Sequence, residues 1–290
     1  MPFNADARAT PTISTQPGLL AERLQRFTPQ VMAVPGGQVA YRQAGAQRVS
    51  HVLLHGIGSA SGSWLMQLEA AQGGGSGLLA WDAPGYAVSS PVAPGRPDAG
   101  DYARQLWAWL DALGITHPVT LVGHSLGALM ATRAAVQRPA QVARLVLLAP
   151  AQGYARATAE DRHKKLHDRL DQLAALGPEG LGQQRGAGMV SPNAPPELKA
   201  YAQRMMSQIH VSGYTQAAQM LAGGDLITDV VKVQCPVSVA SGQLDTATPQ
   251  AACQAVALAA NTDWLDLGLV GHACALEAAH QVNALLQLTH

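Results

Sequence analysis

The chain has 290 residues, of which 48% are hydrophobic and 13% are charged, and its 19 basic and 19 acidic side chains give a formal net charge of zero. This length can bury one large core, either as a single domain with an inserted subdomain or as two domains. Because basic runs and apolar stretches of ~20 residues are both missing, we expect a small-molecule substrate, with neither nucleic acid nor a membrane as partner.

The chain begins with a predicted N-terminal extension, residues 1–28, in which prolines and small polar residues indicate little order before residue 19. Residues 19–27 fit a short helix. Asp6, Pro11 and Pro17 lie in this region without a continuous apolar segment, which does not fit a secretory signal. We therefore expect a cytoplasmic protein, and its low net charge leaves self-association into a homo-oligomer open.

Strand-like runs then alternate with helical ones. Residues 31–34 and 38–42 flank a Pro-Gly-Gly turn and predict a β-hairpin. Short, unalternating apolar runs typical of strands buried on both faces follow at 51–54, 78–81, 118–122 and 145–149. Between them, residues 101–113 and 128–137 have helical patterns. The order predicts an α/β fold with a mostly parallel, doubly wound sheet, whose core comprises residues 29–150 and 234–290.

Residues 151–233, which we call the inserted segment, interrupt this alternation. Strand-like runs give way to helical ones at 158–176, 195–209 and 213–221, separated by Gly and Pro clusters. The sheet resumes at 237–240 and 264–267, with a helix expected between them at 249–260. A helical insertion between parallel strands predicts a lid over the carboxyl edge of the sheet, where α/β folds bind ligands.

The sequence Gly123-His124-Ser125-Leu126-Gly127 joins a predicted strand to an Ala-rich helix. G-x-S-x-G in this setting is typical of a nucleophile elbow, in which a strained turn lifts the serine hydroxyl above the sheet. The same pattern also arises by chance in Gly-rich turns. The flanking strand and helix favour Ser125 as the nucleophile.

A serine hydroxyl needs a general base, and the base needs an orienting acid. In this architecture the acid and then the histidine follow the serine along the chain. Asp245 and His272 each come just after a predicted strand, at the same edge of the sheet as Ser125. We therefore predict Ser125, Asp245 and His272 as the catalytic residues, with Asp263 and Asp266 as the next candidates for the acid.

Acyl transfer also requires donors for the developing oxyanion. One is the backbone N–H after the nucleophile, that of Leu126, and the other comes from the loop after the third strand. We assign the N–H of Ile57 to that second role, with Gly58 or Ser59 as fallbacks. His55 is expected to brace this loop, and His124 to pack within the elbow.

The sequence gives no support for a metal or cofactor. The histidines lack metal-ligand spacing, and the three cysteines, Cys235, Cys253 and Cys274, fit neither a disulfide framework nor a zinc site. The run at 73–77 is Gly-rich but precedes a strand and lacks the following Gly-Lys-Ser/Thr, so we expect a connector instead of a phosphate loop.

Together these motifs resemble the α/β-hydrolase superfamily over residues 30–290. The resemblance rests on residues 55–58, 82–89, 123–127, 242–245 and 271–272. Within it, residues 272–277 and Asn283 are similar to the enol-lactonase and carboxylesterase branch. That branch implies hydrolysis of an ester or lactone through an acyl-Ser125 intermediate, without cofactor or metal. Ala87 stands where the family usually has Gly, which restricts the loop backbone.

The same resemblance leaves two alternatives open. Carbon–carbon bond hydrolases of ring-fission diketones use the same three residue types under a helical lid, but they usually have Trp and Asn where this chain has Ala273 and His124. A ligand receptor that keeps the triad is the second alternative. Haloalkane dehalogenases and epoxide hydrolases of this superfamily use an aspartate as the nucleophile. Because position 125 is a serine, these two classes are disfavoured.

The sequence indicates the character of the pocket but does not name the substrate. Apolar residues of the inserted segment suggest an apolar or mixed pocket, although such residues usually form lid core: Tyr154, Met189, Met205, Met206, Tyr214 and Met220. Arg156, Arg185 and Arg204 could meet a substrate carboxylate or could simply be solvated. Cys274, two residues after His272, could narrow the entrance to the site or fill the core.

Overall fold

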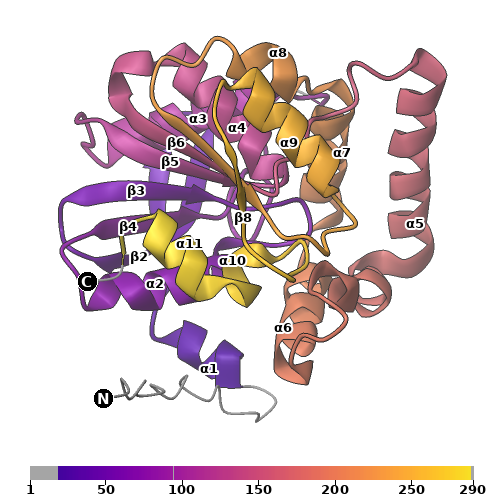
Figure 1. The fold of residues 1–290 in the computed structure, drawn as a ribbon, viewed down its shortest axis with the longest axis horizontal. Helices are drawn as coiled ribbons and strands as arrows, with labels where there is room; N and C mark the ends of the chain where they lie inside the picture. The colour runs from indigo at the N-terminus through magenta and orange to yellow at the C-terminus, as the bar shows by residue number, and fades with distance from the viewer. Residues whose placement is uncertain (1–18, 94, 289–290) are drawn as a thin grey trace, which may run out of the picture.

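The computed structural model describes residues 19–93 and 95–288, so the expectation of little order before residue 19 lies outside the described residues. A sheet with the strand order β1-β2-β4-β3-β5-β6-β7-β8 runs through the molecule (Figure 1). The strands are β1 (Gln30–Val34), β2 (Gly37–Gly45), β3 (Val49–Leu54), β4 (Gly77–Trp81), β5 (Val119–His124), β6 (Val142–Leu148), β7 (Val237–Ser241) and β8 (Trp264–Asp266).

Most of the sheet is parallel. β1 and β2 form the predicted hairpin, β2 pairs antiparallel with β4, and every pairing from β4 through β8 is parallel. Val52 and Leu54 enter the apolar layer on one face of the sheet, and Leu53 enters the layer on the other. The unalternating apolar runs are therefore strands buried on both faces, as predicted.

Helices cover both faces of the sheet (Figure 1). One layer contains α3 (Ala99–Ala112), α4 (Leu126–Gln137) and α9 (Gln250–Ala259). The other contains α1 (Leu19–Gln25), α2 (Leu65–Gln72), α10 (Cys274–Glu277) and α11 (Ala279–Leu285). This arrangement confirms the doubly wound α/β fold. The predicted helix at 101–113 is α3, which begins with a capping box between Asp98 and Asp101.

Helices α2, α10 and α11 were not expected from the sequence. Residues 65–68 at the start of α2 are all buried, the polar Gln67 among them, so polar and apolar residues of this short helix do not follow a clear helical period. Helix α10 spans four residues, about one turn, which is too short to show a period. The run at 73–77 connects α2 to β4, as predicted for a connector.

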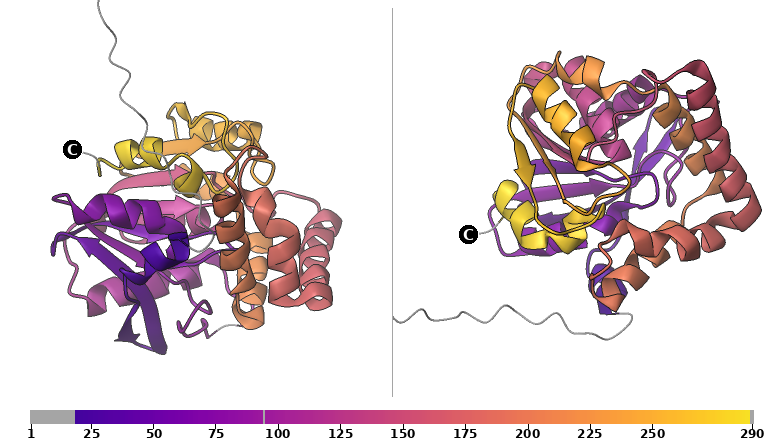
Figure 2. Two further views of the ribbon diagram at one scale, coloured as in Figure 1. Left: turned by 90° about the horizontal axis from the view of Figure 1, so that it is seen from below. Right: turned by 45° about the vertical axis from the view of Figure 1, so that its right-hand side comes forward.

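The inserted segment forms helices α5 (Ala159–Arg185), α6 (Pro196–Ser207), α7 (Val211–Gly223) and α8 (Leu226–Val230). Gly177, with a φ of 63° and a ψ of 177°, breaks the helical backbone within α5, and Pro178 follows. Helices α5 and α6 lie beyond one end of the sheet in both further views (Figure 2), whereas α8 packs against α4 and α9. The exact boundaries of the inserted segment stay a prediction.

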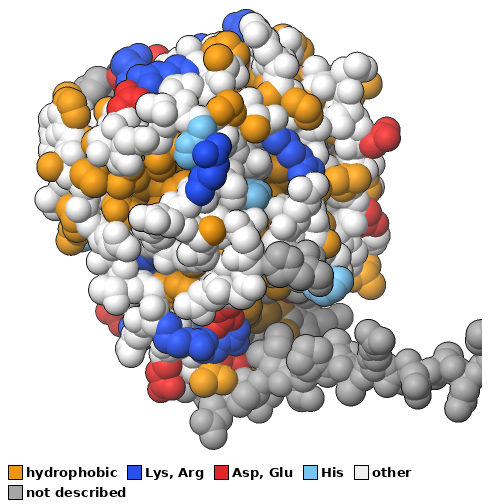
Figure 3. Space-filling view, turned by 90° about the vertical axis from the view of Figure 1, so that its left-hand side faces the viewer, with side chains coloured by type: hydrophobic (Ala, Val, Ile, Leu, Met, Phe, Trp, Pro, Cys, Tyr) orange, Lys and Arg blue, Asp and Glu red, His pale blue; other side chains and the backbone are white. Residues whose placement is uncertain are grey.

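On the face shown in Figure 3, basic and acidic side chains form small groups separated by hydrophobic and neutral surface. In the part of the chain that the structure describes, none of the helices combines the length and apolar character needed to cross a bilayer.

Candidate active site

Ser125 lies in a strained turn between β5 and α4. Its φ of 53° and ψ of −115° fall where few residues other than glycine are found. Its backbone holds the turn, because Ser125 N–H donates to Leu148 O at 3.0 Å and Ser125 O accepts from Ala151 N–H at 3.1 Å. A Cβ at position 127 would lie 2.2 Å from Leu54 O, so only glycine fits there. The structure therefore forms the predicted elbow.

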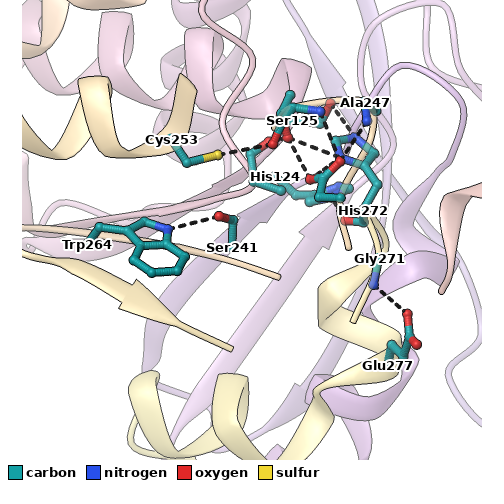
Figure 4. A network of polar contacts seen from close by, with 12 residues as sticks. His124, Ser125, Ser241, Ala247, Cys253, Trp264, Gly271, His272 and Glu277 are labelled. Atoms are coloured by element: carbon teal, nitrogen blue, oxygen red, sulfur yellow. Dashed lines mark hydrogen bonds and ion pairs between the residues drawn. The ribbon is translucent and has the colours of Figure 1, made fainter. Parts of the chain in front are cut away.

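The three predicted catalytic side chains are hydrogen-bonded in series, and Figure 4 labels two of them, Ser125 and His272. His272 Nε2 lies 2.9 Å from Ser125 Oγ, and His272 Nδ1 lies 2.8 Å from Asp245 Oδ2. Because a carboxylate only accepts, the proton sits on Nδ1, and Nε2 is left to accept from the serine hydroxyl. Among the alternative acids, Asp266 instead accepts from Gly268 N–H and Gln243.

Asp245 is buried but surrounded by donors. Its Oδ1 accepts from Ala247 N–H at 2.8 Å and Thr248 N–H at 2.9 Å, and its Oδ2 accepts from Thr248 Oγ1 at 2.7 Å. Burial alone would raise the pKa of this carboxyl, but the hydrogen bonds from His272 and Thr248 outweigh it and lower the pKa below its usual value. Asp245 therefore stays charged and fixes the tautomer of His272.

Two further histidines hold the surrounding loops. His124 Nε2 donates to the backbone oxygen of His272 at 2.8 Å, and burial together with neighbouring His272 lowers the pKa of His124 to about 3. His55 Nδ1 donates to Gly56 O at 2.8 Å, and its Nε2 accepts from Ala83 N–H at 3.0 Å. His55 thus braces the loop after β3, as predicted.

The two backbone N–H groups predicted to bind an oxyanion belong to residues that line the site. Leu126 is the first residue of α4, so its N–H has no acceptor within the helix. Between described residues, no backbone hydrogen bond uses the N–H of Ile57, whose carbonyl accepts from Tyr86 Oη at 2.8 Å. Ile57, Leu126 and Ser125 all line the same cavity.

That cavity has a volume of about 430 Å³ and lies between the carboxyl edge of the sheet and the inserted segment. Five of the apolar residues singled out from the sequence line it: Tyr154, Met189, Met205, Met206 and Tyr214. Met220 is buried outside the lining. Cys274, the first residue of α10, is fully buried in the core and does not line the cavity, so the structure supports the core-filling role.

A family model for the alpha/beta hydrolase family matches residues 52–285. The chain belongs to the alpha/beta hydrolase family. It is 27% identical over 243 residues to (E)-2-((N-methylformamido)methylene)succinate hydrolase from Acinetobacter baylyi, which covers 81% of this chain and 88% of that protein.

Solved structures share the fold of this hydrolase. A thermophilic esterase from Thermogutta terrifontis superposes with a TM-score of 0.78 at 19% identity, covering 90% of this chain and 97% of the esterase. The enol-lactonase from Burkholderia xenovorans LB400 gives 0.70 at 19% identity, covering 89% and 99% of the two chains. At these identities the likeness shows the fold alone.

The hydrolase also has a polar bridge that the sequence did not reveal. Glu277 Oε2 accepts from Gly271 N–H at 2.8 Å and from Ser191 N–H at 2.9 Å, and Glu277 Oε1 accepts from Ser191 Oγ (Figure 4 shows the bond to Gly271). Beside it, Ala273 N–H donates to Met189 O at 2.6 Å. The loop that carries His272 is thus tied directly to residues 189–191 of the inserted segment.

The three arginines considered from the sequence lie in different parts of the structure. Arg185 lines the cavity, Arg156 pairs with Asp225 at 3.0 Å, and Arg204 lies outside the cavity. Lys165 and Arg169, which sequence reasoning did not single out, also line it. Their spacing of four residues puts them on one face of α5, but the sequence does not say what that face meets.

Proposed function

We propose that this hydrolase cleaves a carboxylic ester or lactone of a small molecule through an acyl-Ser125 intermediate. The hydrogen-bonded series Ser125–His272–Asp245 carries the proposal, because it joins a nucleophile, a base and an orienting carboxylate beside two backbone donors. The cavity volume of about 430 Å³ supports a small-molecule substrate, since such sites measure roughly 300–1,000 Å³.

In the first half of the reaction, His272 Nε2 takes the proton from Ser125 Oγ as the oxygen attacks the substrate carbonyl carbon. The carbonyl π electrons move to oxygen, and the N–H groups of Ile57 and Leu126 stabilise the resulting oxyanion. Asp245 stabilises the imidazolium that forms. When the C–O bond to the alcohol breaks, His272 donates its proton to the leaving oxygen, and the acyl group stays on Ser125.

In the second half, water replaces the alcohol. His272 Nε2 removes a proton from the water as its oxygen attacks the acyl carbon, and the same two N–H groups stabilise the new oxyanion. Collapse breaks the bond to Ser125 Oγ, which recovers its proton from His272. The acid is released and the enzyme returns to its starting state. In this proposal the helices of the inserted segment act as a lid that limits access of water.

The name of the similar succinate-derivative hydrolase supports hydrolysis in general, and the fold shared with an esterase and an enol-lactonase is compatible with an ester or lactone bond. Hydrolysis of p-nitrophenyl esters of two- to six-carbon acids by wild type, Ser125→Ala and Ser63→Ala tests the proposal. Ser63 also lines the cavity, and its hydroxyl donates to Ala60 O, so it is a matched control.

We expect Ser125→Ala to lower kcat by about 10⁶-fold, and Ser63→Ala to keep most of the activity. Carbon–carbon cleavage of a ring-fission diketone with no ester turnover would overturn the proposal. So would ester hydrolysis that survives in Ser125→Ala. If the wild-type protein binds esters but does not hydrolyse them, the result would favour the alternative of a ligand receptor that keeps the triad.

A further inference from the structure

The cavity beside Ser125 carries positive charge with no compensating acid in its lining. Lys165, Arg169 and Arg185, all from α5, line it, and of the residues the structure describes no Asp or Glu does so. Arg169 and Arg185 are partly buried, and Lys165 is exposed. A cavity of this kind attracts anions, because one sign of charge between apolar walls focuses the electrostatic field.

The contacts of these three cations are all with neutral groups. Arg169 Nη1 donates to Tyr214 Oη at 3.2 Å, and Arg185 Nη1 donates to Gln172 Oε1 at 3.0 Å. The ammonium of Lys165 lies 4.7 Å from the centre of the Tyr154 ring. Within the described chain, none of the three forms an ion pair with a carboxylate.

Two cations of the inserted segment that do not line the cavity form ion pairs with acids. Lys164 pairs with Asp168 at 2.6 Å, and Arg156 pairs with Asp225 at 3.0 Å. Acids therefore neutralise these two outer charges and leave the three cavity charges unpaired; among the described residues, Lys199 and Arg204 also lie outside the cavity without an ion pair. Holding a partly buried guanidinium without a counter-ion costs free energy, which a bound anion recovers.

We propose that the substrate carries a carboxylate remote from the bond that is cleaved, bound by Arg169 and Arg185 with Lys165 beside them. The planar guanidinium matches a carboxylate through two parallel N–H···O bonds. Phosphate sites commonly add backbone N–H groups at a helix N-terminus, whereas these side chains project from within α5 and its last turn. This inference rests on the proposed function, because it takes the cleaved bond to lie at Ser125.

Matched pairs of esters test the charge preference. The p-nitrophenyl monoester of adipate and p-nitrophenyl hexanoate have the same acyl length but differ by one terminal carboxylate. A second pair, 4-carboxyphenyl and 4-carbamoylphenyl hexanoate, moves the charge to the alcohol side. We expect wild type to have the higher kcat/KM for the anionic member of at least one pair.

In Arg169→Gln/Arg185→Gln, that anionic-to-neutral ratio should fall about 10- to 100-fold, the value expected for lost charge-assisted hydrogen bonds. Lys164→Gln, one residue from Lys165 but paired outside the cavity, should keep the wild-type ratio. If the double variant does not fold, Lys165→Gln at an exposed position replaces it, with a smaller decrease expected. Ratios near one in wild type, or ratios unchanged in the variants, overturn the inference.

Binding to Ser125→Ala separates this inference from the proposed function. Calorimetry should detect adipate but not the neutral adipamide, and adding Arg169→Gln/Arg185→Gln should remove adipate binding. Adipate binding without ester hydrolysis in wild type would support the carboxylate site and overturn the proposed function. Ester hydrolysis with neither an anion preference nor adipate binding would overturn the inference and leave the function standing.

Discussion

Removing the carboxylate of Glu277 should both destabilise the protein and slow the reaction. Glu277 accepts hydrogen bonds from the N–H groups of Gly271 and Ser191 and from Ser191 Oγ. Glu277→Ala leaves two N–H groups without an acceptor. Each buried N–H group without a partner costs roughly 1–3 kcal/mol of folding free energy, and the cost is smaller where water reaches this half-buried site. We expect a loss of about 2–4 kcal/mol in the free energy of unfolding, which corresponds to a Tm lower by roughly 5–15 °C.

The effect on catalysis follows from the position of the bridge. Gly271 precedes His272, so a loosened loop lets the imidazole move away from Ser125, and misplacement of about 1 Å can cost on the order of 100-fold. We expect kcat for a p-nitrophenyl ester to fall about 10- to 100-fold in Glu277→Ala, measured well below its Tm. Glu277→Gln should keep most of both properties, because its amide oxygen can still accept from the backbone N–H groups.

A double-mutant cycle with Ser191→Ala checks the reasoning. Ser191→Ala removes one of the three hydrogen bonds, so its effect should largely disappear when Glu277 is already alanine. The reasoning is refuted if Glu277→Ala has the wild-type Tm within about 2 °C and kcat within about twofold, since three hydrogen bonds to a carboxylate cannot be that weak.

Three further changes test other parts of the site and core. Asp245→Asn should lower kcat by about 10⁴-fold through the wrong tautomer of His272, and Asp266→Asn should retain most of the activity, as steady-state kinetics would show. Cys274→Leu should lower the stability by about 1–3 kcal/mol and reduce activity on small and large esters alike; a KM raised for large esters alone, with an unchanged Tm, would contradict core filling. Burial chiefly lowers the pKa of His124 to about 3 and that of His51 to about 4. Both side chains bind protons more readily in the unfolded chain, so the free energy of unfolding should fall as the pH drops from about 6.5 toward 4, by up to about 1.4 kcal/mol per pH unit for each histidine. In urea titrations over this range, His51→Asn should lose less free energy of unfolding than wild type.

The fold and the main chemical groups could be predicted because their signals are local. The apolar strands, the Gly-rich turn at Ser125 and the strand-end positions of Asp245 and His272 are each visible within a few residues. Parallel strands bring their carboxyl ends to one edge, so the order along the chain was enough to bring the three side chains together. The hydrogen-bond distances confirm that they meet.

What the sequence could not reveal depends on contacts between distant segments. Glu277 meets Ser191 across 86 positions, and no local pattern links them. Arg169 and Lys165 have the spacing of an exposed helix face, which is ordinarily solvated, and only the packing of α5 turns that face toward the cavity. At Ala87, where the family usually has Gly, the sequence does not give the backbone conformation. Ala87 has a φ of 46°, a left-handed conformation that glycine adopts with less strain.

The acyl-enzyme is the most direct test of the central claim. Wild-type enzyme quenched in acid during turnover of a p-nitrophenyl ester should carry the acyl mass, and peptide mapping should locate it on Ser125. The adduct and the turnover should both disappear in Ser125→Ala, while Ser63→Ala retains them. Steady turnover with the acyl group on another residue, or with more than a few per cent of the wild-type kcat left in Ser125→Ala, would contradict the account.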